Sequence, residues 1–292
     1  MWGDRALAWS ADSQLFAAAL DTKGLARGRV GPEGIRLERW HLPARTRCTK
    51  FLPASHDVLA GLWGGEVSLV EENGAVVPVA SLQQPDSVWS ITFAPEGDRV
   101  AVAGWTNPGA LLKVSTWQAG QAGAQLEELR EPDGNCAPLV AWSPDGRRLC
   151  WSPGPAGPNR LGFLGQSAFE AHADDITSLA FTADGRFLIT ASYDRTVVVR
   201  DGEKGQSLAP PERFADLVYG ATVHPQAALV AVGEGNRLHL LRLDPGEPPR
   251  FSRLSEQTMD EGVQSLAFSP NGQHLLVMTW NHLHLVRVEL EP

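Results

Sequence analysis

Histidines and one serine are the residues of this chain whose types and spacing could carry catalysis or metal binding. His282 and His284 alternate along an expected strand, so their side chains share a face from which two imidazoles could hold a metal ion. No third ligand is evident nearby in the sequence, which favours an incidental pair. Residues 165–169 (GQSAF) lack the closing glycine of a nucleophile elbow, and no glycine-rich phosphate loop with its lysine is found. We therefore predict no catalytic residue, no metal, no cofactor and no enzyme activity.

Large aromatic side chains recur at one position of a repeated phrase and give a sharper signal. Twelve residues after the residue that anchors the phrase lie Trp63, Trp105, Tyr193 and Trp280. Four residues before the anchor, the chain carries, among others, Arg5, Arg47, Trp89 and Tyr219. These residue types are enriched at binding hot spots, because they combine a large area to desolvate with a polar group. We predict that they bind a partner. The alternative is that the rings pack between neighbouring sheets.

The phrase that positions these side chains is an aromatic or aliphatic anchor closing an apolar run, followed by a turn. It returns seven times, with anchors at Trp9, Phe51, Phe93, Trp142, Phe181, Val223 and Phe268. Successive anchors lie 42, 42, 49, 39, 42 and 45 residues apart. A period of about 40 residues with several short strands in each unit is typical of a propeller, since each small sheet can bury its faces only against its neighbours. The aromatic anchors are expected in the core.

The fifth unit, residues 172–201, resembles a WD repeat, and the resemblance extends in degraded form over almost the whole chain. The structural hydrogen-bond set of that family falls here on His172, Thr190 and Asp194. The resemblance therefore implies that these three side chains hold the unit together and take no part in chemistry.

Arginine replaces the tryptophan that gives the WD family its name. At that position, 19 residues past the anchor, stand Arg200, Arg242 and Arg287 in units five, six and seven. Unit one has Gly28 there, so an arginine fits only if the register slips by one. The resemblance also implies that the turn twelve residues past the anchor opens on the narrower face of the propeller, around the central channel, where partners bind.

Composition excludes several classes of partner. The net charge of -9 argues against nucleic acid as the main partner, because backbone binding requires clustered lysine and arginine. No stretch reaches the roughly 20 apolar residues that cross a bilayer, and residues 1–5 have neither the basic start nor the apolar core of a signal peptide. The three cysteines, Cys48, Cys136 and Cys150, are too scattered for a disulfide framework. We expect no membrane partner and a cytoplasmic location.

The whole chain is expected to form one domain. Its 292 residues exceed the common domain size, but a propeller grows by adding sheets rather than by thickening one core. We predict that residues 1–292 form a single all-β domain, a seven-bladed β-propeller of four-stranded antiparallel blades.

The last blade is expected to differ from the others. Only residues 1–4 precede the first expected strand, too few to complete that blade, so it should have three strands or a very short fourth. Its final strand, residues 282–289 (HLHLVRVE), would then expose unpaired backbone groups, which invite a strand from another chain. We expect a partner or a second copy to pair there.

These observations favour a non-catalytic protein–protein interaction scaffold. It would dock a partner segment or subunit on the aromatic and arginine positions, within a multi-protein assembly. Two other classes stay open. A small-molecule sensor would use the mouth of the central channel, with Arg5 and Arg47 binding an anion. A propeller enzyme would need carboxylate ligands converging on a metal there, and Asp21 is the one carboxylate among the candidate positions.

Overall fold

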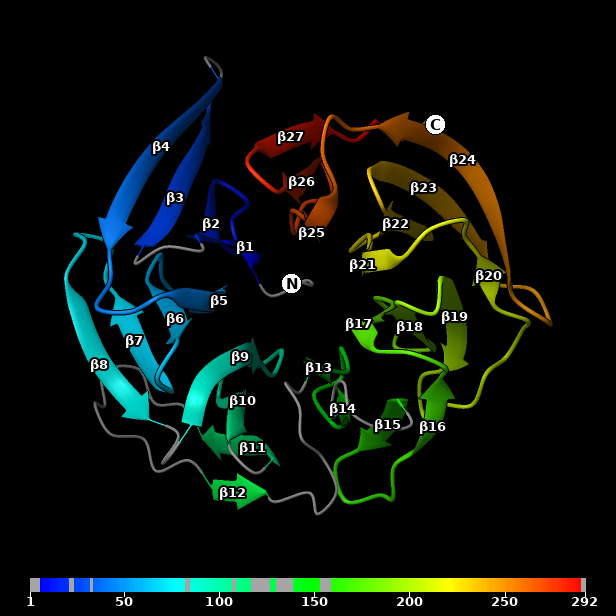
Figure 1. Ribbon diagram of the computed structural model, residues 1–292, viewed down its shortest axis with the longest axis horizontal. Helices are drawn as coiled ribbons and strands as arrows, with labels where there is room; N and C mark the ends of the chain where they lie inside the picture. The colour runs from blue at the N-terminus through cyan, green and yellow to red at the C-terminus, as the bar shows by residue number, and fades with distance from the viewer. Residues whose placement is uncertain are drawn as a thin grey trace. The chain divides into compact units, whose positions relative to one another are not determined.

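The computed structural model of the protein contains strands and turns. It describes residues 6–20, 24–31, 34–81, 85–106, 109–116, 127–129, 139–152 and 159–289. Figure 1 labels the strands in chain order. The chain divides near Trp142 into two compact units, each of which contains several of the seven repeat units of the sequence.

The first unit holds three four-stranded antiparallel sheets. The first sheet consists of β1 (Leu7–Trp9), β2 (Leu15–Leu20), β3 (Gly24–Gly31) and β4 (Gly34–His41). The second consists of β5 (Thr46–Phe51), β6 (Val58–Leu62), β7 (Glu66–Val70) and β8 (Val76–Ser81). The third consists of β9 (Pro85–Phe93), β10 (Arg99–Thr106), β11 (Gly109–Thr116) and β12 (Glu127–Leu129). In each sheet the strands pair in sequence order, so every connection joins neighbours.

The later strands follow the same plan. One sheet consists of β13 (Leu139–Trp142), β14 (Leu149–Ser152), β15 (Asn159–Phe163) and β16 (Phe169–His172). The next consists of β17 (Ile176–Phe181), β18 (Phe187–Ser192), β19 (Thr196–Asp201) and β20 (Glu212–Arg213). Another consists of β21 (Val218–Val223), β22 (Leu229–Glu234), β23 (Arg237–Asp244) and β24 (Arg250–Thr258). The last has three strands, β25 (Val263–Phe268), β26 (His274–Thr279) and β27 (Leu283–Arg287).

The predicted blade count is therefore correct in part. The described residues form six four-stranded antiparallel sheets, whereas the seventh sequence unit forms a sheet of three strands. The expected three-stranded last sheet is present, with β27 at its edge (Figure 1).

A short polar side chain holds the turn after the anchor in four units. It belongs to Ser10, Ser143, Thr182 and Ser269. In each case Oγ accepts the backbone N–H five residues later, over 2.9 to 3.1 Å, and the hydroxyl donates to the Asp or Asn two residues later. Such local bonds compete with strand pairing and favour a turn. The repeated phrase is thus a turn signal with a defined hydrogen-bond pattern.

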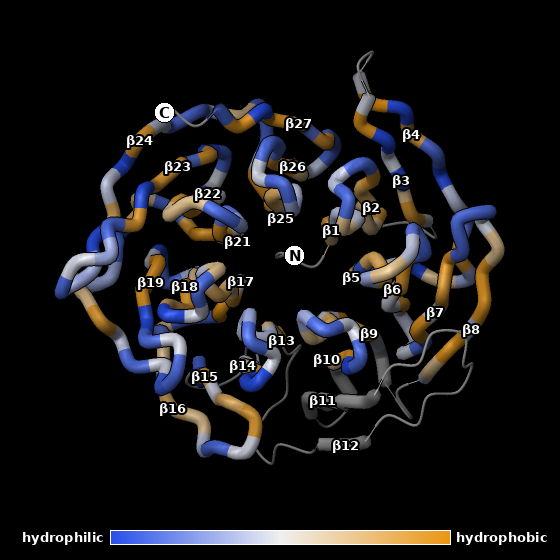
Figure 2. The backbone as a smooth tube through the Cα atoms, turned by 180° about the vertical axis from the view of Figure 1, so that it is seen from behind, coloured by the Kyte–Doolittle hydropathy of each residue, from blue (hydrophilic) through white to orange (hydrophobic). Residues whose placement is uncertain are grey.

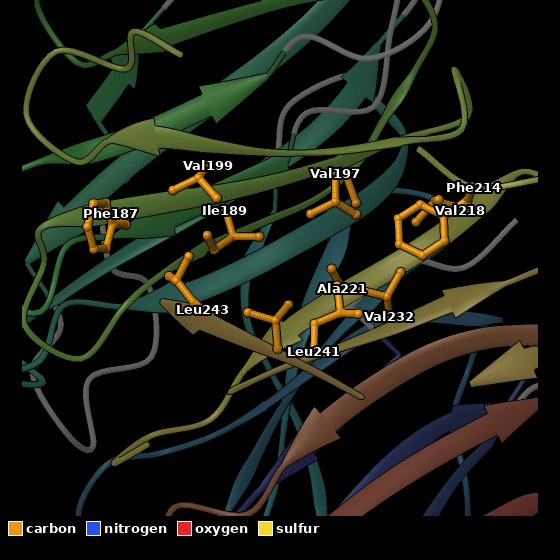
Figure 3. Packing of buried hydrophobic residues seen from close by; sticks show 12 residues of the cluster. Phe187, Ile189, Val197, Val199, Phe214, Val218, Ala221, Val232, Leu241 and Leu243 are labelled. Atoms are coloured by element: carbon orange, nitrogen blue, oxygen red, sulfur yellow. The ribbon is translucent and has the colours of Figure 1, made fainter. Parts of the chain in front are cut away.

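Neighbouring sheets within each of the two compact units bury their apolar residues against one another. Figure 3 shows one such cluster, in which Ile189 and Val199 of one sheet pack with Val232 and Leu241 of the next. The strand segments are richer in hydrophobic residues than the turns between them (Figure 2). Burial of this kind contributes about 25 cal/mol per Å² of apolar surface.

The predicted core role of the anchors is confirmed at three positions. Phe51, Phe93 and Phe268 each belong to a buried cluster. Trp9 and Trp142 are also buried, whereas Phe181 is half-buried.

The register of unit one does not slip, so Gly28 itself holds the position of the family's tryptophan. Gly28 pairs with Phe16, just as Arg200 pairs with Leu188 in unit five, so the register is the same in both. A Cβ at Gly28 would overlap the Phe16 ring, which is fully buried. The aromatic ring on the neighbouring strand therefore takes the space of the missing side chain, and no arginine needs to shift into it.

Candidate functional site

The first candidate site is a stack of three side chains in the first compact unit. The guanidinium of Arg47, on β5, lies 4.5 Å from the ring centroid of Trp63 and 4.5 Å from that of Trp89. Arg47 and Trp89 are half-buried, and Trp63 is 45% exposed. Cation–π attraction of this kind contributes about 0.5 to 2 kcal/mol, and more as water is excluded. The stack therefore has a preformed geometry with one indole still open to a partner.

Backbone contacts hold the exposed indole in place. Trp63 follows β6, its N–H donates to the carbonyl of Arg45 over 2.8 Å, and it bridges to Ser87 on β9. Gly64 and Gly65 continue the turn with φ of +93° and +81°, values that glycine adopts without strain. β5, β6 and β9 contact one another (Figure 1). The residue that presents the ring is thus anchored to the neighbouring sheet.

Two tyrosines of the second compact unit stand at the same repeat positions as Trp63 and Trp89 and contact each other directly. Tyr193 and Tyr219 form an edge-to-face pair with ring centroids 5.4 Å apart and an interplanar angle of 75°. Both are half-buried. In this pair, the residue twelve past one anchor meets the residue four before the next anchor, whereas in the stack the equivalent residues Trp63 and Trp89 both contact the Arg47 guanidinium. The sequence showed the two sets, and the structure shows which members of the sets meet.

Trp280 is the most exposed of the predicted aromatics that the structure describes. It is 60% exposed, in the turn between β26 and β27. Glu261 fixes this turn, because its carboxylate accepts the backbone N–H of Asn281 over 2.7 Å, the Asn281 side-chain amide over 2.6 Å and the Thr279 hydroxyl over 3.1 Å. These bonds lower the pKa of Glu261, with the Asn281 amide as the main cause. A rigid turn therefore presents an exposed indole.

Two predicted partner-binding positions cannot be placed in this way. The backbone of Trp105 lies in β10, opposite Ser87 and Ala110, but its side chain lies outside the described residues. Arg5 also lies outside the described residues.

The predicted structural set of the fifth unit comes together as a buried network. His172 contacts Thr190 Oγ1 through Nε2 over 2.7 Å and Asp194 Oδ2 through Nδ1 over 3.0 Å. Asp194 also accepts the backbone N–H groups of Ala173 and Thr196, each over 3.0 Å. The His172 side chain is 1% exposed, and Thr190 is fully buried. The network joins the last strand of one sheet to two strands of the next.

Arg200 completes this network in a way that sequence reasoning missed. Its Nε–H donates to Thr190 Oγ1 over 3.0 Å, and its two terminal nitrogens donate to the carbonyl oxygens of Gly205 and Ala171. Arg200 is 3% exposed, and burial lowers its pKa to about 10. Its occupation of the family's tryptophan position was the available signal, because an indole also has one N–H to donate.

The protonation states follow from the donors. Arg200 can only donate, so Thr190 Oγ1 accepts from it and can direct its own proton to His172 Nε2, which leaves Nδ1–H to donate to Asp194. Burial lowers the pKa of His172 and favours this neutral form. Burial alone would raise the pKa of Asp194, but hydrogen bonds from His172 and Thr196 outweigh it and hold the pKa well below its usual range.

This chain of hydroxyl, imidazole and carboxylate has the connectivity of a hydrolase triad. A catalytic hydroxyl must reach a substrate, however, and the Thr190 hydroxyl is fully buried and already bonded to Arg200. The network therefore holds two sheets together, and its hydroxyl is not available to a reacting molecule.

The two alternating histidines lie near each other on the last sheet. The rings of His282 and His284 have centroids 6.1 Å apart. Within the described ranges, no group of three His, Cys, Asp or Glu side chains is arranged to hold a metal ion. In the same part of the chain, no helix is long and apolar enough to cross a membrane.

Comparisons with known proteins agree with the strand pattern. Residues 165–201 match the WD domain, G-beta repeat. Chromatin assembly factor 1 of Mus musculus has a subunit that is 24% identical over 123 residues, which cover 36% of this chain and 22% of that protein. The chain thus spans well under half the length of this relative.

Solved structures share the fold at low sequence identity. A chain in the crystal structure of a mitotic checkpoint complex has a TM-score of 0.80 and 16% identity, over 97% of this chain and 86% of that one. A chain of Kuenenia stuttgartiensis hydrazine synthase has a TM-score of 0.81 and 13% identity, over 100% and 98%.

The chain is therefore an all-β β-propeller with four-stranded antiparallel blades. Residues 165–201 carry the WD-repeat pattern, and the rest of the chain shares the propeller fold.

Proposed function

We propose that this propeller is a non-catalytic scaffold that docks a protein segment or subunit through its aromatic and arginine positions. WD-repeat propellers typically mediate protein–protein interactions, which supports the general class. The observation that carries the specific surface is the stack of Arg47 between Trp63 and Trp89, with Trp63 45% exposed. Hot spots combine a rigid, partly desolvated centre with one face open to the partner, and this stack has both.

The exposed Trp280 and the Tyr193–Tyr219 pair extend the proposed docking positions to the second compact unit. Trp280 lies in a turn that Glu261 holds through Thr279 and Asn281, and it remains 60% exposed. A preformed contact loses less conformational entropy on binding than a flexible one. Full packing between sheets, the alternative for these rings, does not account for the exposure of Trp63 and Trp280.

The test begins with the partners that co-purify in stoichiometric amounts with the full chain from its native extract. Affinity for the main partner is then measured for the wild-type protein and for Trp63→Ala. Loss of a hot spot costs about 2 kcal/mol, so affinity should fall by about thirtyfold while the folded fraction stays the same. Unchanged affinity in a folded variant would overturn the proposed surface.

Leu37→Ala is the matched control, because Leu37 is 59% exposed on β4 and belongs to none of the proposed positions. It should leave affinity unchanged. A similar loss in both variants would point to a general effect of removing exposed apolar surface.

We propose further that β25–β27 count as the seventh blade, and that a partner strand pairs with residues 282–289 at the edge of that sheet. In the part of the chain that the structure describes, no strand pairs with the outer edge of β27, which supports this second contact. We also propose a cytoplasmic location, with which Cys48 and Cys150, both buried as thiols, are compatible.

A further inference from the structure

Two strands of the second compact unit have the same sequence pattern but different surroundings. Residues 237–244 read RLHLLRLD, and residues 282–289 read HLHLVRVE. At each of the eight positions the residue type agrees, from a basic side chain at the start to an acidic one at the end. Both strands also pair with the preceding strand in the same register, His239 with Val232 and His284 with Val277. Residues 237–244 are therefore a template for the surroundings of residues 282–289.

The first of the two strands is covered along its whole length. β24 pairs antiparallel with β23 from Arg237–Thr258 at one end to Asp244–Arg250 at the other. Under this cover Leu238 is 7% exposed and the His239 side chain 1%. In the described part of the chain no strand pairs with the other edge of β27, and Leu283, His284 and Leu285 are half-buried.

The direction of the backbone groups on β27 follows from its ladder. The N–H of Val288 donates to Gln273 over 2.9 Å, and the carbonyl of His282 accepts from Thr279 over 2.9 Å. Because antiparallel partners alternate, the even-numbered residues bond to β26, and Leu283, Leu285 and Arg287 direct their N–H and C=O groups to the open edge. Leu238 of the template corresponds to Leu283, and by the same alternation its N–H and C=O groups point toward β24.

The template also shows which charges cover such a strand. His239 Nε2 lies 2.6 Å from Glu234 of the neighbouring strand β22. On the other side Glu256 lies opposite His239, and its carboxylate is 3.5 Å from His239 Nδ1 and 3.6 Å from Arg237 Nε. At the other end, Arg250 lies opposite Asp244. The register between β23 and β24 shifts by one residue between Leu240 and Leu241. The basic and acidic residues of β24 therefore stand six positions apart, whereas the acid and the histidine that they face stand five apart. On β27 the corresponding residues are Glu289 and His284, with His282 in place of Arg237.

We propose that the edge of β27 binds an extended segment of a partner protein with this chemistry. The segment runs antiparallel to β27 and, with a one-residue bulge like that of β24, places a basic residue opposite Glu289 and, six positions later, an acidic residue opposite His284. Main-chain bonds to residues 283, 285 and 287 give affinity, and the two charged positions select the segment. The inference rests on the proposed pairing at residues 282–289 and adds the identity of the strand.

The experiment supplies the template strand to the full chain. The sequence RFSRLSEQT, that of β24, is fused after Pro292 through a Gly-Ser spacer. Residues 290–292 and the spacer then make a connection of five residues, as between Asp244 and Arg250. Fusion keeps the strand at an effective concentration in the millimolar range, so weak pairing is detected. Hydrogen exchange of the amides of Leu283, Leu285 and Arg287 is measured with and without the fusion.

We expect fast exchange of these three amides in the unfused chain and slowing of about tenfold or more in the fusion. Leu285→Pro should abolish the slowing, because it removes an outward N–H and leaves the bonds to β26 intact. Slow exchange in the unfused chain would overturn the proposal, since the chain would already cover the edge. So would unchanged fast exchange in the fusion.

A charge-reversed fusion tests the selectivity. With Lys in place of the Glu of RFSRLSEQT, protection should fall by about threefold to fivefold, and His284→Glu in the chain should restore it. Equal protection by both fusions would show that any strand pairs at this edge, and the inferred chemistry would be wrong. Neither result depends on Trp63, so failure here is distinct from failure of the proposed docking surface.

Discussion

Arg200 takes the place of an indole donor toward Thr190: its Nε–H lies 3.0 Å from Thr190 Oγ1. A tryptophan there would offer one N–H, whereas the guanidinium also bonds the carbonyl oxygens of Ala171 and Gly205. Arg242 and Arg287 hold the same repeat position but are exposed. One residue type at one repeat position thus has two different roles, and burial decides which.

Replacing this arginine should destabilise the fold without touching any exposed surface. Arg200→Met leaves two backbone carbonyl oxygens without their donor, so the free energy of unfolding should fall by about 2 to 4 kcal/mol. Chemical denaturation followed by circular dichroism measures the change. Arg242→Met, at the same repeat position but exposed, should change stability by less than about 0.5 kcal/mol. Equal effects of the two substitutions would contradict a structural role for the buried network.

His56 should stabilise the first compact unit more in mild acid than at alkaline pH. Its Nε2 lies 3.0 Å from Asp12 and its Nδ1 3.3 Å from Glu72, and these contacts, chiefly that with Asp12, raise the pKa of His56. A raised pKa in the folded state gives stability that is present below the ordinary value of about 6.5 and is lost as pH rises through the folded value. The melting temperature lost in His56→Gln should therefore be larger at about pH 5.5 than at about pH 9.

His41→Gln is the control for this pH dependence, because His41 is exposed on β4. Its melting temperature should follow the wild-type protein at both pH values. A loss in His56→Gln that is the same at both pH values would show that packing, and not the charge of His56, is responsible.

Gly28→Ala should destabilise the first sheet by overpacking. The added methyl group would overlap the Phe16 ring, which is fully buried and has no free space to enter. Overpacking of this kind costs about 1 to 3 kcal/mol, measured as a lower denaturation midpoint. Gly31→Ala, where the nearest contact of a Cβ is 3.9 Å away, serves as the control and should be nearly neutral. If both variants were equally stable, the ring would have to move at no cost.

Trp280→Ala should separate a docking residue from a core residue. Trp280 is 60% exposed, so its loss should cost less than about 1 kcal/mol of folding stability. Trp151 is 5% exposed and packs against Gly162, so Trp151→Ala should cost about 3 to 5 kcal/mol. Thermal unfolding compares the two directly. A sharp loss of stability in Trp280→Ala would assign this ring to the core.

The sequence predicted the parts of the fold that depend on local chemistry. The phrase around Ser143 and Thr182 is a turn whose hydroxyl bonds are made within five residues, so it can be recognised without the rest of the molecule. The network of His172, Thr190 and Asp194 could be predicted from the resemblance, because its members stand at fixed positions of the repeat.

The remaining features depend on contacts between different strands and different repeats. The place of Arg47 between two indoles depends on how β6 and β9 approach β5, which the spacing alone does not determine. The role of Gly28 depends on Phe16 lying opposite it, a pairing between strands that the spacing alone does not reveal. The turn that carries Trp280 is fixed by the Glu261 bonds, which join residues 18 to 20 positions apart.

The stack around Arg47 has an optical consequence. The fluorescence of an indole depends on nearby water and charge. The Trp63 indole lies against the Arg47 guanidinium, and the Trp89 indole contacts the same guanidinium. A partner that covers the exposed 45% of Trp63 would remove water from that ring and shift its fluorescence toward shorter wavelength. With the other tryptophans replaced where the fold tolerates it, the docking surface would report its own occupancy without any attached dye.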